Sequence, residues 1–203
     1  MEVLKDAYLP ADIEDREWVQ LFQSGKEAGF NRLVLEHKDR IYSLCVRLLQ
    51  NRDDAEDCAQ ETFVKVYHGL KDFRMESMFS SWLYRIAVNT CKNKQMSKPY
   101  REAKQNQNLD AADGEGESKA EMSASLMSSV SPEQVLENKT KGAAIEAAIA
   151  RLPENQRVLI VLRDIEGRSY EEVAETVGLN LGTVKSRINR GRLQLQEWLR
   201  ELS

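Results

Sequence analysis

Cationic and hydrogen-bonding side chains gather on one predicted helix near the C-terminus of this chain. Residues 169–196 predict a helix, a tight turn and a second helix, which Val184 and Ile188 anchor to a core. The other face of that second helix carries Thr183, Lys185, Ser186, Arg187, Asn189, Arg190 and Arg192. Such side chains can bond phosphates and base edges, as in a recognition helix of the DNA major groove. A basic, solvated face on a structural helix pair is the alternative for this segment alone.

Capping residues indicate where the first of these two helices begins and ends. Ser169 and Glu172 have the spacing of a capping box, in which each satisfies a free backbone N–H of the other. Gly178 suits the left-handed conformation that closes a helix. The pair therefore has local signals at both ends of its first helix.

Aromatic and cationic residues are interleaved in a second segment, 79–94. On a helix, Phe79, Leu83 and Ile86 fall on one side and are expected to pack. The residues that fall partly on other sides are Trp82, Tyr84, Arg85, Asn89 and Lys92. Exposed aromatic rings suit single-stranded nucleic acid, because each stacked base contributes about 1–3 kcal/mol while cations follow the backbone. Core packing of Trp82 and Tyr84 is an equal alternative at this stage.

Catalytic and metal-binding patterns are not found in the sequence. The cysteines and histidines are Cys45, Cys58, Cys91, His37 and His68, and no pair has metal-ligand spacing. We expect reduced thiols packed in the helices of a cytoplasmic protein, with no metal, no cofactor and no small-molecule substrate. A Gly-rich phosphate loop and a Ser/His/Asp or Cys/His set are lacking, which disfavours a helical enzyme.

Charge is segregated along the 203 residues, whose net charge is −4. Segments 53–61 and 110–121 are acidic, while 85–104 and 185–192 are basic. An acidic protein of this kind can still present basic faces to phosphate. No apolar run reaches the about 20 residues of a membrane span, and the N-terminus lacks the apolar run of a signal peptide.

Helical periodicity dominates the chain, and no run of alternating β-branched residues predicts a strand. Predicted helices before the helix pair cover 15–23, 27–49, 53–67, 79–94, 132–151 and 153–165, with a capping pair at Asp53 and Glu56. Residues 98–131 are polar and rich in Gly, Ser and acids, as in a flexible linker. We therefore expect an all-α fold of two small helical domains. The predicted divisions are an extension at 1–14, a domain at 15–98, an acidic linker at 99–131 and a domain at 132–203.

Three blocks of the sequence together resemble one family of proteins. They read DDAEDCAQETFVKVY, FSSWLYRIAVNTCKN and LPENQRVLIVLRDIEGRSYEEVAETVGLNLGTVKSRINRGR. In order and spacing they resemble an extracytoplasmic-function (ECF, group IV) sigma factor of bacterial RNA polymerase. The resemblance covers about 15–98 and 133–199, and it implies that these are sigma regions 2 and 4.

The resemblance implies a role for each block. The residues matching the motif that binds core polymerase are Asp57, Gln60, Glu61 and Phe63. Those matching recognition and melting of the −10 element are Phe73, Phe79, Trp82, Tyr84, Arg85, Asn89 and Lys92, with the loop 73–79 trapping a flipped base. Those matching −35 contacts are Thr183, Lys185, Ser186, Arg187, Asn189 and Arg190. Asn189 stands where some relatives carry an aromatic residue, so base preferences do not transfer.

The resemblance implies three partners: the β′ clamp helices and β flap of core polymerase, promoter DNA, and an anti-sigma protein. The anti-sigma protein can be soluble or anchored in a membrane. The implied function is stress-responsive transcription initiation at −35/−10 promoters, without catalysis by the chain itself. The alternative is an autonomous helix-turn-helix regulator with 1–97 as a sensor or dimerisation domain. Such a regulator binds its operator unaided, usually as a dimer on a two-fold site.

Overall fold

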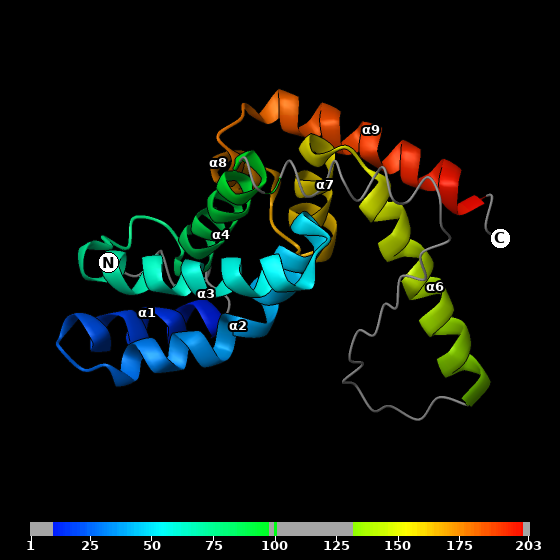
Figure 1. Ribbon diagram of the computed structural model, residues 1–203. Helices are drawn as coiled ribbons and strands as arrows, with labels where there is room; N and C mark the ends of the chain where they lie inside the picture. Colours follow the sequence, from blue (N-terminus) through cyan, green and yellow to red (C-terminus); the bar gives the residue numbers. More distant parts are fainter. Residues whose placement is uncertain (1–9, 98–99, 101–131, 201–203) are drawn as a thin grey trace.

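The computed structural model describes residues 10–97, Tyr100 and 132–200, and all regular structure in them is helical (Figure 1). The all-α prediction is therefore confirmed. The helices are α1 (Pro10–Gln23), α2 (Ala28–Leu49), α3 (Arg52–Gly69), α4 (Phe79–Met96), α6 (Pro132–Arg151), α7 (Glu154–Ile160), α8 (Tyr170–Val177) and α9 (Leu181–Arg200), with short turns η2 (Leu70–Asp72) and η3 (Val161–Ile165). The predicted linker, apart from Tyr100, and residues 1–9 of the predicted extension lie outside the described residues.

Helices α1 to α4 form one bundle, here called the N-terminal bundle. Leucine, isoleucine and cysteine recur along one side of α2, which is therefore mainly apolar, with buried His37 between Leu33 and Ile41. Ile41, Leu44 and Leu83 are fully buried where α2 meets α4. Burial of each such side chain contributes about 1.5–3 kcal/mol, and this face is what holds α4 in position.

The first two helices approach each other closely at Gly29. A Cβ atom at this position would lie 2.2 Å from the carbonyl oxygen of Trp18 and 2.7 Å from the amide nitrogen of Phe22. Glycine allows the two backbones to come this close because it has no Cβ atom. Beside the crossing, Tyr67 packs edge to face on Phe22 and Phe30, and these two rings are tilted relative to each other, with ring centroids 5.0 to 5.9 Å apart.

The three cysteines lie together where α2, α3 and α4 meet, and each is free and buried. The Sγ atoms of Cys91 and Cys45 are 3.5 Å apart. A hydrogen bond to Cys91, followed by burial, raises the pKa of the Cys58 thiol. The prediction that these thiols pack inside helices is confirmed. The raised pKa of Cys58 and of Cys91 makes these two thiols poor nucleophiles.

Two predicted helix starts are wrong, and the error at α3 has a local cause. Helix α3 begins at Arg52, because the side chain of Asn51 accepts a hydrogen bond from the backbone N–H of Asp54 at 2.9 Å. Asn51 is thus the cap, in place of the predicted pair at Asp53 and Glu56. Helix α1 begins at Pro10, and Asp15 lies inside it, buried against His37 Nε2 at 2.8 Å.

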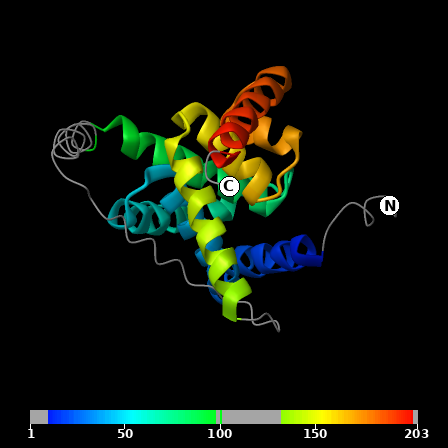
Figure 2. The same ribbon diagram turned by 90° about the vertical axis from the view of Figure 1, so that its right-hand side faces the viewer.

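Helices α6 to α9 form the second group, here called the C-terminal group. Leu159 and Ile160 of α7 are buried, as are Val184 and Ile188 of α9, and the two helices pack on each other. Near the end of α9, the guanidinium of Arg151 lies 4.6 Å from the ring centroid of Trp198. The N-terminal part of α6 extends away from both groups (Figure 2).

The C-terminal group lies directly on the N-terminal bundle, with α8 beside α4 and α6 and α7 beside α2 (Figure 1). Arg157 of α7 is 7 % exposed and donates a hydrogen bond to the carbonyl oxygen of Leu48 at 3.2 Å. Within the described ranges, no helix has the length and apolarity to cross a membrane. In the same ranges, no cluster of His, Cys, Asp and Glu is arranged to hold a metal ion.

Candidate nucleic-acid interface

The helix pair forms as its capping residues predict. The Ser169 hydroxyl oxygen accepts from the N–H of Glu172 at 3.1 Å, and Glu172 Oε2 accepts from the N–H of Ser169 at 2.8 Å. Burial acts to raise the pKa of Glu172, but the hydrogen bonds from Ser169 and Ser81 outweigh it and hold this pKa below its ordinary value. Gly178 closes α8 with φ at 69°.

Helix α9 presents the predicted −35 residues on one face. Val184 and Ile188 are buried on the opposite side, and the Asn180 side chain accepts from the N–H of Thr183 at 2.8 Å. The exposed members of the set are Lys185, Ser186, Asn189 and Arg190, while Thr183 and Arg187 are half-buried. The structure therefore brings these six residues together along one exposed edge of the C-terminal group.

Arg192, which the sequence groups with this basic face, has a different role. Its guanidinium bonds the Asp164 carboxylate at 2.5 and 3.0 Å and the Tyr170 hydroxyl at 3.3 Å. These bonds attach α9 to η3 and α8. The Arg192 side chain is 46 % exposed, but its charge is already paired with the Asp164 carboxylate, which makes it less available to DNA.

Helix α4 carries the predicted −10 residues other than Phe73, which follows η2, and these side chains lie in several environments. Asn89 and Lys92 are exposed, and Trp82 is half-buried and stacks on Phe73 with ring centroids 4.7 Å apart. Phe79 is buried at the start of the helix. Arg85 is partly exposed and forms an ion pair with Glu175 of α8.

Of the two alternatives left open for Tyr84, exposure or packing, the structure supports packing, because this side chain is only 1 % exposed. Its hydroxyl donates to Glu166 Oε2 at 2.6 Å, and the guanidinium of Arg168 lies 4.3 Å from its ring centroid. Burial, with the neighbouring Glu166 carboxylate, raises the pKa of Tyr84. Periodicity within α4 puts Tyr84 off the bundle's core, but it cannot reveal that the C-terminal group covers this side.

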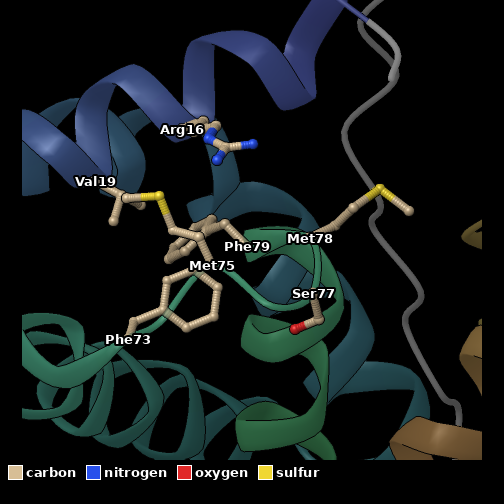
Figure 3. Close-up of a pocket in the computed structure, with 7 residues that line it drawn as sticks. All are labelled: Arg16, Val19, Phe73, Met75, Ser77, Met78 and Phe79. Atoms are coloured by element: carbon tan, nitrogen blue, oxygen red, sulfur yellow. The ribbon is translucent and has the colours of Figure 1, made fainter. Parts of the chain in front are cut away.

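A pocket lies where the loop 73–79 passes beneath α1 (Figure 3). The residues that line it are Arg16, Val19, Phe73, Met75, Ser77, Met78 and Phe79. Met75 has φ at 56°, an uncommon conformation for this residue type that turns the loop sharply. Sequence reasoning missed Arg16 and Val19, because nothing local links α1 to a loop more than fifty residues away. Arg16 adds a donor group to a pocket that is otherwise mainly apolar.

The predicted polymerase-binding residues lie along the outer side of α3. The side chains of Asp57 and Glu61 are 72 % and 56 % exposed, Gln60 is exposed, and Phe63 is half-buried against the core. Lys65 pairs with Glu61 at 2.7 Å. This face therefore keeps anionic character, but part of its charge is balanced by cations on α3 and α4.

Two family models match this chain: Sigma-70 region 2 at residues 33–98 and Sigma-70, region 4 at residues 142–195. The chain is 36% identical over 189 residues to the RNA polymerase sigma-H factor of Pseudomonas aeruginosa, covering 93% of this chain and 95% of that protein. It is 35% identical over 184 residues to the ECF RNA polymerase sigma factor SigW of Bacillus subtilis, covering 91% and 96%. Among solved structures it is similar to the sigma factor RpoE in complex with the anti-sigma factor NepR from Bartonella quintana, with a TM-score of 0.60, 26% identity, and 84% and 96% of the two chains covered. The chain therefore belongs to the ECF family of RNA polymerase sigma factors.

Proposed function

We propose that this chain is a promoter-specificity subunit, which binds core RNA polymerase and directs it to −35/−10 promoters. The observation that carries this proposal is the presence, in one chain and in order, of regions 2 and 4. Helix α9 exposes cations and amides for duplex DNA, and α4 with its adjacent pocket offers aromatic and cationic groups for separated strands. The chain itself supplies no catalytic step, and it acts where RNA polymerase acts, in the cytoplasm.

The direct test combines the purified chain with core polymerase and a library of genomic fragments. We expect specific initiation from some fragments, and little binding to duplex DNA by the chain alone. A footprint left by the lone protein at nanomolar concentration, together with no initiation, would instead support the autonomous regulator.

Core binding is proposed to use the outer face of α3. Glu61→Ala or Gln60→Ala should weaken the complex with core by up to about 1 kcal/mol, or about fivefold, because these groups are exposed. Competition for core against a labelled sigma factor measures the effect. Glu197→Ala, which removes an exposed carboxylate from α9, is the matched control and should leave core affinity unchanged. Equal affinities for all three variants would contradict this division of labour.

Arg16 is proposed to contact the base trapped in the pocket beside α1. In the described part of the chain its guanidinium has no hydrogen-bond or ion-pair partner, so its donors are available to base acceptors. Arg16→Ala should reduce binding of a single-stranded −10 oligonucleotide by about 1 kcal/mol, and it should flatten the preference at one base position only. Arg16→Lys should keep the affinity and lose the preference. A uniform loss across all positions would identify a phosphate contact instead.

An anti-sigma partner is also part of the proposal, since the similar RpoE structure was solved with the anti-sigma factor NepR. Sequestration of the free chain by such a protein, with release under stress, fits a two-group architecture whose DNA-contacting faces lie close together. Co-purification from cells, before and after envelope stress, tests for the partner.

A further inference from the structure

The pocket between α1 and the loop 73–79 is too small for the base that it is proposed to hold. Its free volume is about 20 Å³, which is room for one water molecule. A nucleobase is many times larger than a water molecule. One wall of the pocket must therefore move before a base enters, and the walls differ in how easily they can do so.

Three walls of the pocket are fixed by packing. Val19 belongs to α1 and is fully buried, and Phe79, at the start of α4, is 4 % exposed. Phe73 stacks on Trp82, with ring centroids 4.7 Å apart. Moving any of these side chains would disturb contacts that hold the N-terminal bundle together.

The start of the loop is also tied to α1, through the side chain of Gln23. Its Nε2 donates hydrogen bonds to the carbonyl oxygens of Leu70 and Phe73, at 3.0 and 2.9 Å. Arg16, Val19 and Gln23 recur every three or four residues, so they share one face of α1. This face therefore fixes the loop as far as Phe73.

Met75 is the wall best able to move. Residues 74–77 form no hydrogen bond from backbone to backbone with any residue that the structure describes. The φ of Met75, 56°, lies in a region that a residue with a side chain seldom adopts, so little opposes a change of conformation there. The side chain is unbranched and flexible, which lets it fill an irregular gap and also leave it.

The Met75 side chain also lies where a base would be held. Figure 3 shows it reaching from the loop toward Val19, beside the rings of Phe73 and Phe79, whereas Met78 points away from these residues. A thioether and a flat base are both groups that pack well on aromatic rings. One can therefore take the place of the other against the same walls.

We propose that Met75 is a plug in the base pocket, which occupies the base position in the free chain and swings out when a −10 base enters. The proposal rests on the proposed role of this pocket at the −10 element. Displacing the plug lowers the apparent affinity for DNA by the fraction of molecules in which the pocket is open. Shortening the plug should therefore tighten binding, but only to a strand that inserts a base.

The test uses the holoenzyme formed by the full chain and core polymerase. The wild type selects a preferred strand from a random pool of short single-stranded DNA oligonucleotides, and this strand is remade with an abasic nucleotide at each position in turn. Met75→Ala should bind the intact strand about threefold or more tightly than the wild type does. The gain should vanish when the abasic nucleotide stands at one particular position and persist when it stands elsewhere.

Two control variants separate a plug from a general loosening of the loop. Met78→Ala removes the same atoms from the side chain that points away, and it should leave the affinity unchanged. Met75→Leu keeps nearly the same volume in the pocket, so it should show no gain. Circular dichroism confirms that each variant is folded.

Unchanged or weaker binding of the intact strand by Met75→Ala would overturn the plug, and so would a gain that persists at every abasic position. If no position were base-dependent in the wild type, the −10 pocket would be wrong and the plug with it. Initiation from genomic fragments by the wild-type holoenzyme is scored separately. It should occur whether or not Met75 is a plug, so a failure of the plug is distinguished from a failure of the sigma function.

Discussion

Arg190→Ala should weaken recognition of the −35 element by about 1–3 kcal/mol, the range for losing one good base contact. The side chain is exposed on α9, and in the part of the chain that the structure describes it has no ion-pair or hydrogen-bond partner. Nothing inside the fold therefore depends on it, and the loss should fall on DNA binding alone. Promoter binding by the holoenzyme, measured against −35 variants, gives the size of the effect and the base position that loses discrimination.

Arg200→Ala is the matched control, because it removes an exposed arginine from the far end of the same helix. It should leave −35 discrimination intact. Arg190→Ala could instead weaken binding to all promoters equally and lower the salt dependence of that binding. The residue would then be a phosphate contact that positions α9 without reading sequence.

Gly29→Ala should destabilise the N-terminal bundle by about 3 kcal/mol or more, at the upper end for overpacking. The added methyl group would meet backbone atoms of Trp18 and Phe22, which cannot rotate away as a side chain does. The only relief is to move α1 away from α2, which opens the aromatic contacts beside the crossing. Urea unfolding followed by circular dichroism measures the loss.

The comparison for this variant is Gly142→Ala, in the middle of α6, where a new Cβ would meet no atom within 4 Å. Alanine there should stabilise the chain by about 0.5–1 kcal/mol, because it restricts the unfolded state and favours the helix. The same substitution is thus expected to have opposite signs at the two sites. A loss of similar size at both would mean that the crossing at Gly29 is looser than described here.

Features fixed by neighbouring residues could be predicted from the sequence. Ser169 and Glu172 bond each other three residues apart, and Gly178 adopts its left-handed conformation without help from a distant segment. Val184 and Ile188 are buried where their spacing predicts. The helix pair and its exposed cationic face follow from these local rules.

Features fixed by distant partners could not be predicted. Tyr84 is buried by Glu166 and Arg168, more than eighty residues along the chain, so its own helix gives no sign of the cover. Arg16 lines the pocket of the loop 73–79 for the same reason. The start of α3 was misplaced for a local reason: we predicted the capping pair Asp53 and Glu56, whereas the side chain of Asn51 accepts from the N–H of Asp54. The roles of individual residues toward DNA and core stay predictions.

The cysteine cluster of the N-terminal bundle offers an intrinsic probe of this protein's motions. Cys45, Cys58 and Cys91 are each at most 1 % exposed, so an alkylating reagent reaches them only when α2, α3 and α4 part. Under native conditions the rate of alkylation, divided by the rate for an unfolded peptide, therefore gives the free energy of that opening. Binding to core polymerase should slow this reaction, which makes mass spectrometry of the unmodified chain a label-free assay for assembly.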